Sequence, residues 1–487
     1  MELAPQSQSE TPLQRIAGSQ KTMRAALSAA LALAVGLLLR LWMLKDLFQI
    51  VGDTQIYGEI AKNLLRHGSY ALTGEGDTLH STLIRLPGYP LFLALCFRLF
   101  GVDRYVAVAY AQIALELLGC LLLADFARHI APPAFRSGAA LCTLWLAALC
   151  PFTASYAVTP LTETTTLFLL ALAMWSLARF HARPGWKYAL VFAFAVSYAA
   201  MLRPDGALAA VALAPAMAIG LPPAAIPRPR LARMALVCVA LALLPFALWT
   251  ARNWSVFHVF QPLAPRSAAD PGETAYPGWE RWVGTWCLDF TSTYNIYWNV
   301  PEHRLDLTAM PGRAFDSPAQ YAETAALAAA YNSSGHRLTP QIDAGFARLA
   351  QERIAAHPLR YYLWLPLGRL TDMWLRPRVD NLNIDLDWWV YSHHRAETRF
   401  SWAYAGLNAL YLLLGLAGLW LRPRFWQALL AYMLLRSALL LTVTAPETRY
   451  TLECFPMLFA LGGVALYWVT YRVSLSVLKL KASPGSR

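Results

Sequence analysis

Long apolar runs separated by short polar or basic segments dominate the pattern of the chain. Several runs approach the roughly 20 apolar residues that cross a bilayer as a helix. The ten runs that we predict to span the membrane are 23–44, 105–127, 138–156, 164–181, 187–202, 205–221, 233–251, 402–421, 424–444 and 450–472. The pattern therefore predicts an all-α fold, a polytopic membrane helix bundle.

One apolar run is left out of this count. Residues 86–101, "LPGYPLFLALCFRLFG", form a short run that begins with two prolines and contains Arg98. We therefore predict a helix at the membrane surface. With the N-terminus inside, the predicted cytoplasmic loops and tail then hold basic residues at 128–136, 183–187, 228–233, 422–424 and 479–481. If 86–101 crossed, these later loops would face outward, against the positive-inside rule. Both termini are therefore expected in the cytoplasm.

The same topology divides the chain into parts. They are a cytoplasmic tail (1–22), a transmembrane module (23–251) with a first outer loop at 45–104, an outer region (252–401), C-terminal spans (402–472) and a second tail (473–487). Within the outer region, 357–377 carries Arg360, Arg369, Asp372 and Arg376 in a span-like run. We expect this run to lie flat at the interface. The "DLDWWVY" that follows is typical of an aromatic belt.

Composition supports the membrane assignment. Of the 487 residues, 57% are hydrophobic and only 14% are charged, whereas a soluble protein would carry about 25% charged residues. The net charge of +12 is explained by cytoplasmic loops rather than by nucleic acid. Six of the seven cysteines lie in apolar runs, so no disulfide or metal framework is expected. The first apolar run is long and lacks a small-residue cleavage site, so a cleavable signal is not expected.

Polar residues gather on the predicted outer side of the spans. They are Asp53, Glu163, Arg203, Asp205, Arg252, Asn253, Glu447, Arg449 and Tyr450. A carboxylate can take the proton from an attacking hydroxyl, and arginines can stabilise the charge that builds on a phosphate. This combination suits displacement at a sugar carbon whose leaving group is a membrane-bound phosphate.

Each of these residues also has an ordinary structural explanation. Asp53 in "GDTQIYGEI" could cap the helix that follows it, and Glu163 in "TPLTET" could be a first-turn acid. Arg85 could be an interfacial anchor, and Arg203 could end a span at the headgroups. His80 could be a solvated loop residue.

Two charges lie deeper, near the middle of predicted spans. Glu116 falls in the second span and Arg436 in the ninth. Because an unpaired charge there costs at least about 2.5–3.5 kcal/mol, we expect the two to pair with each other.

Aromatic and acidic residues of the outer region leave alternatives open. Trp279, Trp282, Trp286 and Trp298 could stack on an acceptor sugar, but we expect them to pack that region onto the bilayer. Asp385 and Asp387 in "NIDLDWW" have the spacing of a metal-binding pair, yet we interpret them as solvated belt residues. No cofactor is expected, and a divalent metal is possible but not favoured.

The order of motifs resembles a known family. An apolar helix is followed by "GDTQIYGEIAKNLLRHGSY", "IRLPGYPLFLALCFRLFG", "TPLTETTTLFLLALAMW", "RPDG", "RNWSVFHVFQPLAP" and "ETRYTLECFPML". Over roughly 20–260 and 400–470 this is similar to the GT-C membrane glycosyltransferases, in the branch with the protein O-mannosyltransferases and the lipid A aminoarabinose transferase. In that family the surface helix is re-entrant and the donors are polyprenyl-phosphate sugars.

The resemblance implies roles for particular residues. Asp53 would be the catalytic base, assisted by Glu163, where many relatives carry Asp. Arg85 would contact the donor phosphate. The outer arginines would contribute more loosely, and these are Arg203, Arg252 and Arg449. Tyr57, His80 and Tyr450 would position substrates.

The predicted function is therefore an inverting glycosyltransferase of the bacterial inner membrane with a periplasmic active site. It would move a sugar from a polyprenyl-phosphate donor to a hydroxyl of a lipid, glycan or protein. The alternative is a transporter or flippase of a lipid-linked saccharide, but no inverted repeat or midplane site is evident. A membrane scaffold would leave the outer Asp–Glu–Arg pattern unexplained.

Overall fold

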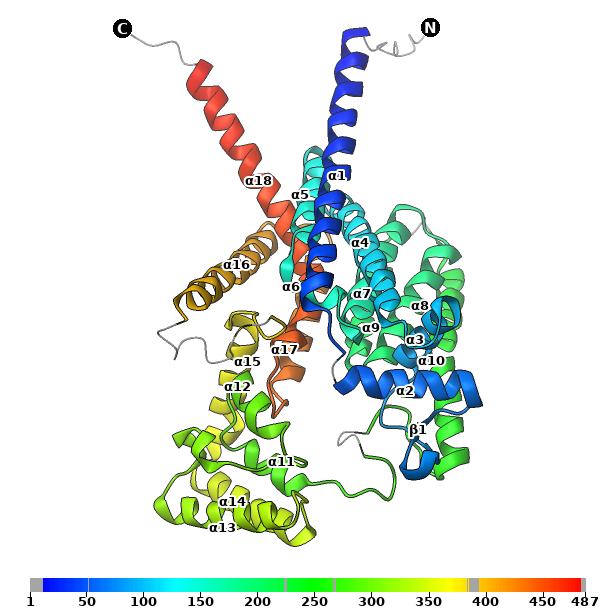
Figure 1. Ribbon diagram of the computed structural model, residues 1–487. Coiled ribbons are helices and arrows are strands. Elements are labelled where there is room, and N and C mark those ends of the chain that lie inside the picture. Colours follow the sequence, from blue (N-terminus) through cyan, green and yellow to red (C-terminus); the bar gives the residue numbers. More distant parts are fainter. Residues whose placement is uncertain are drawn as a thin grey trace, which may run out of the picture.

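The computed structural model describes residues 12–50, 52–222, 226–265, 269–382, 384 and 394–482, with side chains between Thr22 and Ser476. Helices dominate the described chain, and its strands form one two-stranded hairpin. Figure 1 shows the start of α1 (Pro12–Leu47) and the end of α18 (Phe455–Ala482) at one end. Helix α2 (Gly52–His67) and the region from α11 (Pro277–Val283) to α14 (Pro340–Ala356) lie toward the other. The side of the membrane that each end faces stays a prediction.

All ten predicted spans are helical. They are α1 (Pro12–Leu47), α4 (Tyr105–Ile130), α5 (Arg136–Ala148) with α6 (Pro151–Ala157), α7 (Thr162–Ala182), α8 (Trp186–Leu202), α9 (Ala207–Ala218), α10 (Arg228–Phe257), α16 (Arg395–Trp420), α17 (Trp426–Leu440) and α18 (Phe455–Ala482). The all-α membrane bundle is thus confirmed.

Fewer than ten of these helices are long enough to cross a bilayer. By length and composition, six described helices qualify, or seven if the α5–α6 pair, bent by 55°, counts as one span. The remaining apolar helices α8, α9 and α17 are shorter. Helix α17 ends at Leu440 because the chain then turns, and Thr442 and Val443 line a cavity instead of extending the helix.

The loop between α1 and α4 holds α2 (Gly52–His67), β1 (Ala71–Thr73), the short turn η1 (Glu75–Asp77), β2 (Leu79–Ser81) and α3 (Gly88–Phe100). The predicted surface helix is α3. It buries Tyr89, Leu93 and Phe97 against the bundle and exposes Leu95 on its other face. At the start of α3, a Cβ on Gly88 would lie 2.5 Å from the backbone oxygen of Met201, so only glycine permits this contact with α8.

The region between α10 and α16 contains α11 (Pro277–Val283), α12 (Phe290–Ser292), η4 (Thr293–Tyr297), η5 (Leu307–Ala309), η6 (Gly312–Ala314), α13 (Pro318–Ser333), α14 (Pro340–Ala356), η7 (Arg360–Trp364) and α15 (Leu365–Leu375). It has its own core, in which Trp279, Trp282 and Trp286 are almost fully buried with Phe346. These three tryptophans pack inside the region rather than onto a bilayer as predicted. Trp298 is different, since it is 43% exposed.

The expected ion pair between Glu116 and Arg436 is wrong. Glu116 of α4 pairs with Arg40 of α1, while Arg436 of α17 pairs with Asp205 and with Glu453 at 3.0 Å. The physical reason is the packing order. Helix α4 contacts α1, α5 and α7, whereas α17 contacts α9 and the short helix η8 (Thr448–Cys454). Each buried charge is still compensated, but by a nearer partner.

The predicted aromatic belt and the Asp385–Asp387 pair lie outside the described residues.

Candidate active site

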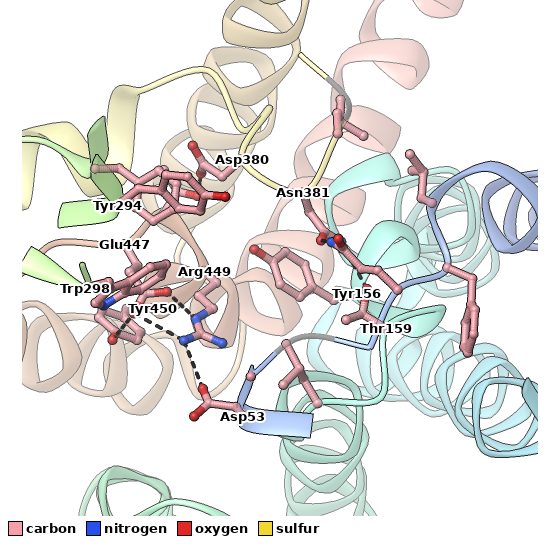
Figure 2. Close-up of a pocket in the computed structure, with 18 of the residues that line it drawn as sticks. Asp53, Tyr156, Thr159, Tyr294, Trp298, Asp380, Asn381, Glu447, Arg449 and Tyr450 are labelled. Carbon is pink, nitrogen blue, oxygen red and sulfur yellow. Dashed lines mark hydrogen bonds and ion pairs between the residues drawn. The ribbon is translucent and has the colours of Figure 1, made fainter. Parts of the chain in front are cut away.

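A cavity of about 1110 Å³ opens where the start of α2 meets the α10–α16 region (Figure 2). Its lining comes from segments far apart in the sequence: the turn before α2, the end of α6, the α12–η4 segment, residues 380–382 and 384, and η8. The bundle and the α10–α16 region therefore build this cavity together.

Asp53 lies at the wall of this cavity, in the first turn of α2. Its Oδ1 accepts a hydrogen bond from Nη2 of Arg85 at 2.9 Å, and its Oδ2 lies 3.5 Å from Nη2 of Arg449. Within the described chain, its hydrogen bonds run to these arginines and none to a backbone N–H of α2. Among the described residues, no backbone N–H of α2 donates to Asp53, so the capping explanation has no hydrogen bond in its favour, whereas the pairing with two arginines fits an electrostatic site.

The charge state of Asp53 follows from these neighbours. Burial would raise the pKa of its carboxyl group, but the positive charges of Arg449 and Arg85 outweigh burial and lower that pKa below its usual value. Asp53 is therefore a carboxylate at neutral pH, and a third of its side chain stays accessible.

Glu163 lies one layer deeper, in the first turn of α7. Its side chain is 2% exposed, and its Oε1 lies 3.3 Å from Nη1 of Arg203 and 3.5 Å from Nη1 of Arg449. Its Oε2 accepts no hydrogen bond from the described residues. Arg449 thus lies between the two predicted carboxylates and links them.

A buried ionic network extends from Glu163 into the bundle. Arg203 lies 3.4 Å from both Asp205 and Glu453, and these two carboxylates in turn pair with Arg436. Helix η8 carries both Arg449 and Glu453, so it connects the cavity wall to this network. Glu453 was not identified from the sequence.

A second cavity of about 660 Å³ adjoins the first. The two share the wall formed by Asp53, Arg85, Leu161, Arg449 and Tyr450. The second cavity also contains Glu163 and Arg203, and aliphatic side chains from α8, α9 and α17 complete its lining. This cavity therefore combines charged groups with an apolar lining.

Both predicted tyrosines lie at the shared wall or next to it. The ring of Tyr57 lies 5.8 Å from Cζ of Arg85, and Tyr57 lines the second cavity. Tyr450 lines both cavities, donates a hydrogen bond to Glu447, and stacks with Arg203 and Arg449. These two rings hold the arginines in place from the apolar side.

Arg252 and His80 do not reach either cavity. His80 is exposed on β2, where its ring bonds to Thr78. Arg252 donates to the carbonyl oxygens of Thr82 and Tyr70, both at 2.8 Å, and its guanidinium lies over the rings of Tyr70 and Trp249. Arg252 therefore fastens the first loop to α10.

This contact gives a testable expectation for Arg252. Because hydrogen bonds from a charged donor contribute about 1.5–3 kcal/mol, Arg252→Gln should lower the stability of the purified protein by an amount in that range. The KM for the lipid-linked donor should stay unchanged. Thermal unfolding and donor titration measure the two effects separately, and an increased donor KM with unchanged stability would instead favour the predicted phosphate contact.

No group of three or more His, Cys, Asp or Glu that could hold a metal ion occurs among the described residues. Metal independence remains a prediction.

Part of the chain is similar to a known family. Residues 85–254 match the family described as dolichyl-phosphate-mannose-protein mannosyltransferases. The match confirms the resemblance to GT-C glycosyltransferases of the O-mannosyltransferase type, and the helices make the chain a multi-pass membrane protein. No curated protein matches the chain significantly.

Similar solved structures have low sequence identity. An oligosaccharyltransferase from Archaeoglobus fulgidus is 14% identical over 92% of this chain, with a TM-score of 0.48. ArnT from Cupriavidus metallidurans, crystallised with undecaprenyl phosphate, is 16% identical over 90% of this chain, with a TM-score of 0.35. The chain covers 50% of the former protein and 77% of the latter, so it spans about half the length of the archaeal enzyme.

Proposed function

We propose that this chain is an inverting glycosyltransferase that moves a sugar from a polyprenyl-phosphate donor to a hydroxyl acceptor at the periplasmic face of a bacterial inner membrane. One observation carries the proposal. Asp53 lies in the wall between two cavities and is held there by Arg85 and Arg449. A carboxylate between two compartments, with cations beside it, can serve a donor on one side and an acceptor on the other.

The smaller cavity suits the lipid-linked donor. Leu202, Leu208 and Leu439 offer aliphatic surface for a polyprenyl chain. Three arginines in the same lining, Arg85, Arg203 and Arg449, offer charge-assisted hydrogen bonds for a phosphate. The family that matches residues 85–254 is described by a dolichyl-phosphate donor, which supports the same class of substrate.

The chemistry follows from this placement. The acceptor hydroxyl approaches from the larger cavity, and Asp53 takes its proton as the oxygen attacks the anomeric carbon. The bond between that carbon and the phosphate oxygen breaks, and its electron pair leaves with the polyprenyl phosphate. Arg85 and Arg449 stabilise the charge that develops there. Attack opposite the leaving group inverts the anomeric centre.

Arg85 and Arg449 also set the pKa of Asp53, the proposed base. Without substrate they keep the pKa of Asp53 low, which makes its carboxylate a weak base. A bound phosphate adds negative charge and competes for the same guanidinium groups, and both effects raise the pKa of Asp53. Asp53 would therefore become a stronger base when the donor is in place.

Other residues have supporting places in this scheme. Glu163 positions Arg203 and Arg449 through its buried carboxylate, and Tyr57 supports Arg85. The acceptor side is built by the α10–α16 region together with η8.

The pH dependence of the reaction gives one test of this arrangement. Because the folded-state pKa of Asp53 lies below its ordinary value of 3.8, kcat/KM, which reports the free enzyme, should lose activity from this group only in more acidic solution. In Arg85→Gln the pKa of Asp53 should rise, so the acid limb should move to higher pH. A pH profile of initial rates measures this shift, and an acid limb that stays in place would exclude Asp53 as the titrating group.

The reaction itself is tested with purified protein and labelled polyprenyl-phosphate sugars. Release of polyprenyl phosphate with transfer of the sugar supports the proposal. Movement of intact donor across vesicles, without sugar release, would favour the flippase alternative.

A further inference from the structure

We propose that the larger cavity is a carbohydrate site and that the acceptor is a neutral glycan, recognised by the Tyr294–Trp298 wall and Asp380. This inference rests on the proposed function, because it names the acceptor of the same reaction. Three independent features of the cavity carry it: an aromatic surface, a buried acceptor atom with an unused lone pair, and the sign of the charges in the lining.

The aromatic surface comes from the α12–η4 segment. Phe290, Tyr294 and Trp298 are four residues apart and line the cavity on one side. The rings of Tyr294 and Trp298 have centroids 5.8 Å apart and are 52% and 43% exposed. Figure 2 shows both near Glu447 and Arg449. Exposed aromatic faces beside a polar cleft are the surface on which the C–H face of a sugar ring stacks.

The tryptophans of the same region show that this exposure is selective. Trp279, Trp282 and Trp286 are at most 2% exposed and form the core of the region. Trp298 belongs to the same segment of chain but contributes to the cavity instead. Packing accounts for the first three residues and leaves the exposure of Trp298 unexplained.

Asp380 supplies the polar partner. Its side chain is 6% exposed, its Oδ2 accepts a hydrogen bond from the hydroxyl of Thr448, and its Oδ1 accepts none from the described residues. The nearest cation, Nε of Arg376, is 3.6 Å from Oδ1, which is too far for a good hydrogen bond. A buried oxygen of this kind is stabilised when a ligand hydroxyl donates to it.

The charged residues that line the larger cavity favour an uncharged glycan. Four carboxylates line the cavity within the described chain, those of Asp46, Asp53, Asp380 and Glu447, against two cations, Arg85 and Arg449. Both arginines already pair with Asp53. A phosphorylated or acidic acceptor would meet this excess of negative charge, whereas a neutral sugar would not.

The size and shape of the cavity also favour a glycan over a peptide. Its volume of about 1110 Å³ exceeds the range of roughly 300–1,000 Å³ for sites of drug-sized ligands, so several sugar rings fit. An extended peptide commonly binds along a strand edge. The described strands, β1 and β2, do not line this cavity.

Ligand-observed NMR tests the inference without any donor. The full chain is placed in lipid nanodiscs, because maltoside detergents would themselves occupy a sugar site. Saturation transfer is measured for cellotriose and chitotriose, for glucose phosphate, and for a short peptide rich in serine and threonine. We expect transfer to the neutral sugars that depends on Tyr294 and Trp298, whereas any transfer to glucose phosphate, which can reach the arginines of the proposed donor site, should not depend on these rings. Trp298→Ala and Tyr294→Ala should each weaken the binding of the neutral sugars roughly tenfold.

Trp364→Ala is the matched control, because Trp364 is 64% exposed in the same region but does not line this cavity. It should leave binding unchanged. Asp380→Asn, which keeps the side-chain volume, should reduce the preference for neutral over phosphorylated sugar. The inference is overturned if no neutral sugar binds, if Trp298→Ala and Trp364→Ala behave alike, if the peptide binds best, or if Trp298→Ala weakens glucose phosphate more than the neutral sugars. Donor turnover is assayed separately. If the protein transfers no sugar, the NMR experiment still shows whether a neutral glycan binds in the larger cavity.

Discussion

Asp53→Asn is expected to abolish sugar transfer while the protein stays folded. The substitution keeps the volume of the side chain and removes the oxygen that would take the acceptor proton. General base catalysis contributes about a hundredfold to ten-thousandfold, and the rate of transfer should fall by that factor. The loss should appear in kcat, because the donor phosphate is held by the arginines and not by the carboxylate. Single-turnover transfer from a labelled donor measures it.

Asp77→Asn is the control for this experiment. Asp77 lies in the same loop, in the exposed turn between β1 and β2, and lines neither cavity. Its backbone φ of 59° suits Asn as well as Asp. This variant should keep full activity. Transfer that continues at the normal rate in Asp53→Asn would remove the proposed mechanism.

Arg436→Gln should produce the largest loss of stability. Arg436 is fully buried in α17 and pairs with Asp205 and Glu453, and its Nε donates to the backbone oxygen of Tyr450 at 3.0 Å. Without the guanidinium, the buried carboxylate of Glu453 and the largely buried one of Asp205 would share Arg203 alone. Breaking a buried ion pair from one side costs about 3–5 kcal/mol. Thermal unfolding of the purified protein should show a correspondingly large decrease in stability.

A second substitution distinguishes this network from the pairing suggested by sequence. Glu453→Gln combined with Arg436→Gln should restore part of the stability, because it removes one of the uncompensated charges. Glu116→Gln combined with Arg436→Gln should restore none, since Glu116 pairs with Arg40. Recovery in the Glu116 double variant, or a harmless Arg436→Gln, would contradict the network.

Much of the bundle could be predicted because its determinants are local. Apolar runs and the charges between them are visible in the sequence, and the ten predicted spans are all helices. The short helix at 88–100 could be predicted from its length, prolines and Arg98, and its position at the membrane surface stays a prediction. Sequence gives only weak limits on where a helix ends inside a bundle, however. Helix α17 is short because the residues after its C-terminal end line a cavity. No property of residues 441–444 predicts this from the sequence.

Side-chain pairing was harder to predict because it depends on packing order. Asp53 and Glu163 could be identified as acidic residues at span ends, and Arg449 does lie between them. Arg252 was predicted to lie with them because the topology puts it on the same side of the membrane. Its actual partners, the backbone carbonyls of residues 70 and 82, reach α10 only in the folded structure.

Phe290, Tyr294 and Trp298 show the same limit on the acceptor side. They lie more than 200 residues after Asp53 in the sequence. Their spacing of four residues indicates a common helical face, yet only the tertiary structure shows that this face meets the cavity.

The wall shared by the two cavities has a consequence for product release. In the proposed reaction, the polyprenyl phosphate would leave through the smaller cavity, where the donor is proposed to bind. The lengthened glycan can leave through the other opening. Neither product has to pass the position of the other, so a new donor could enter before the glycan leaves. Several additions to one glycan would then need no movement of the shared wall.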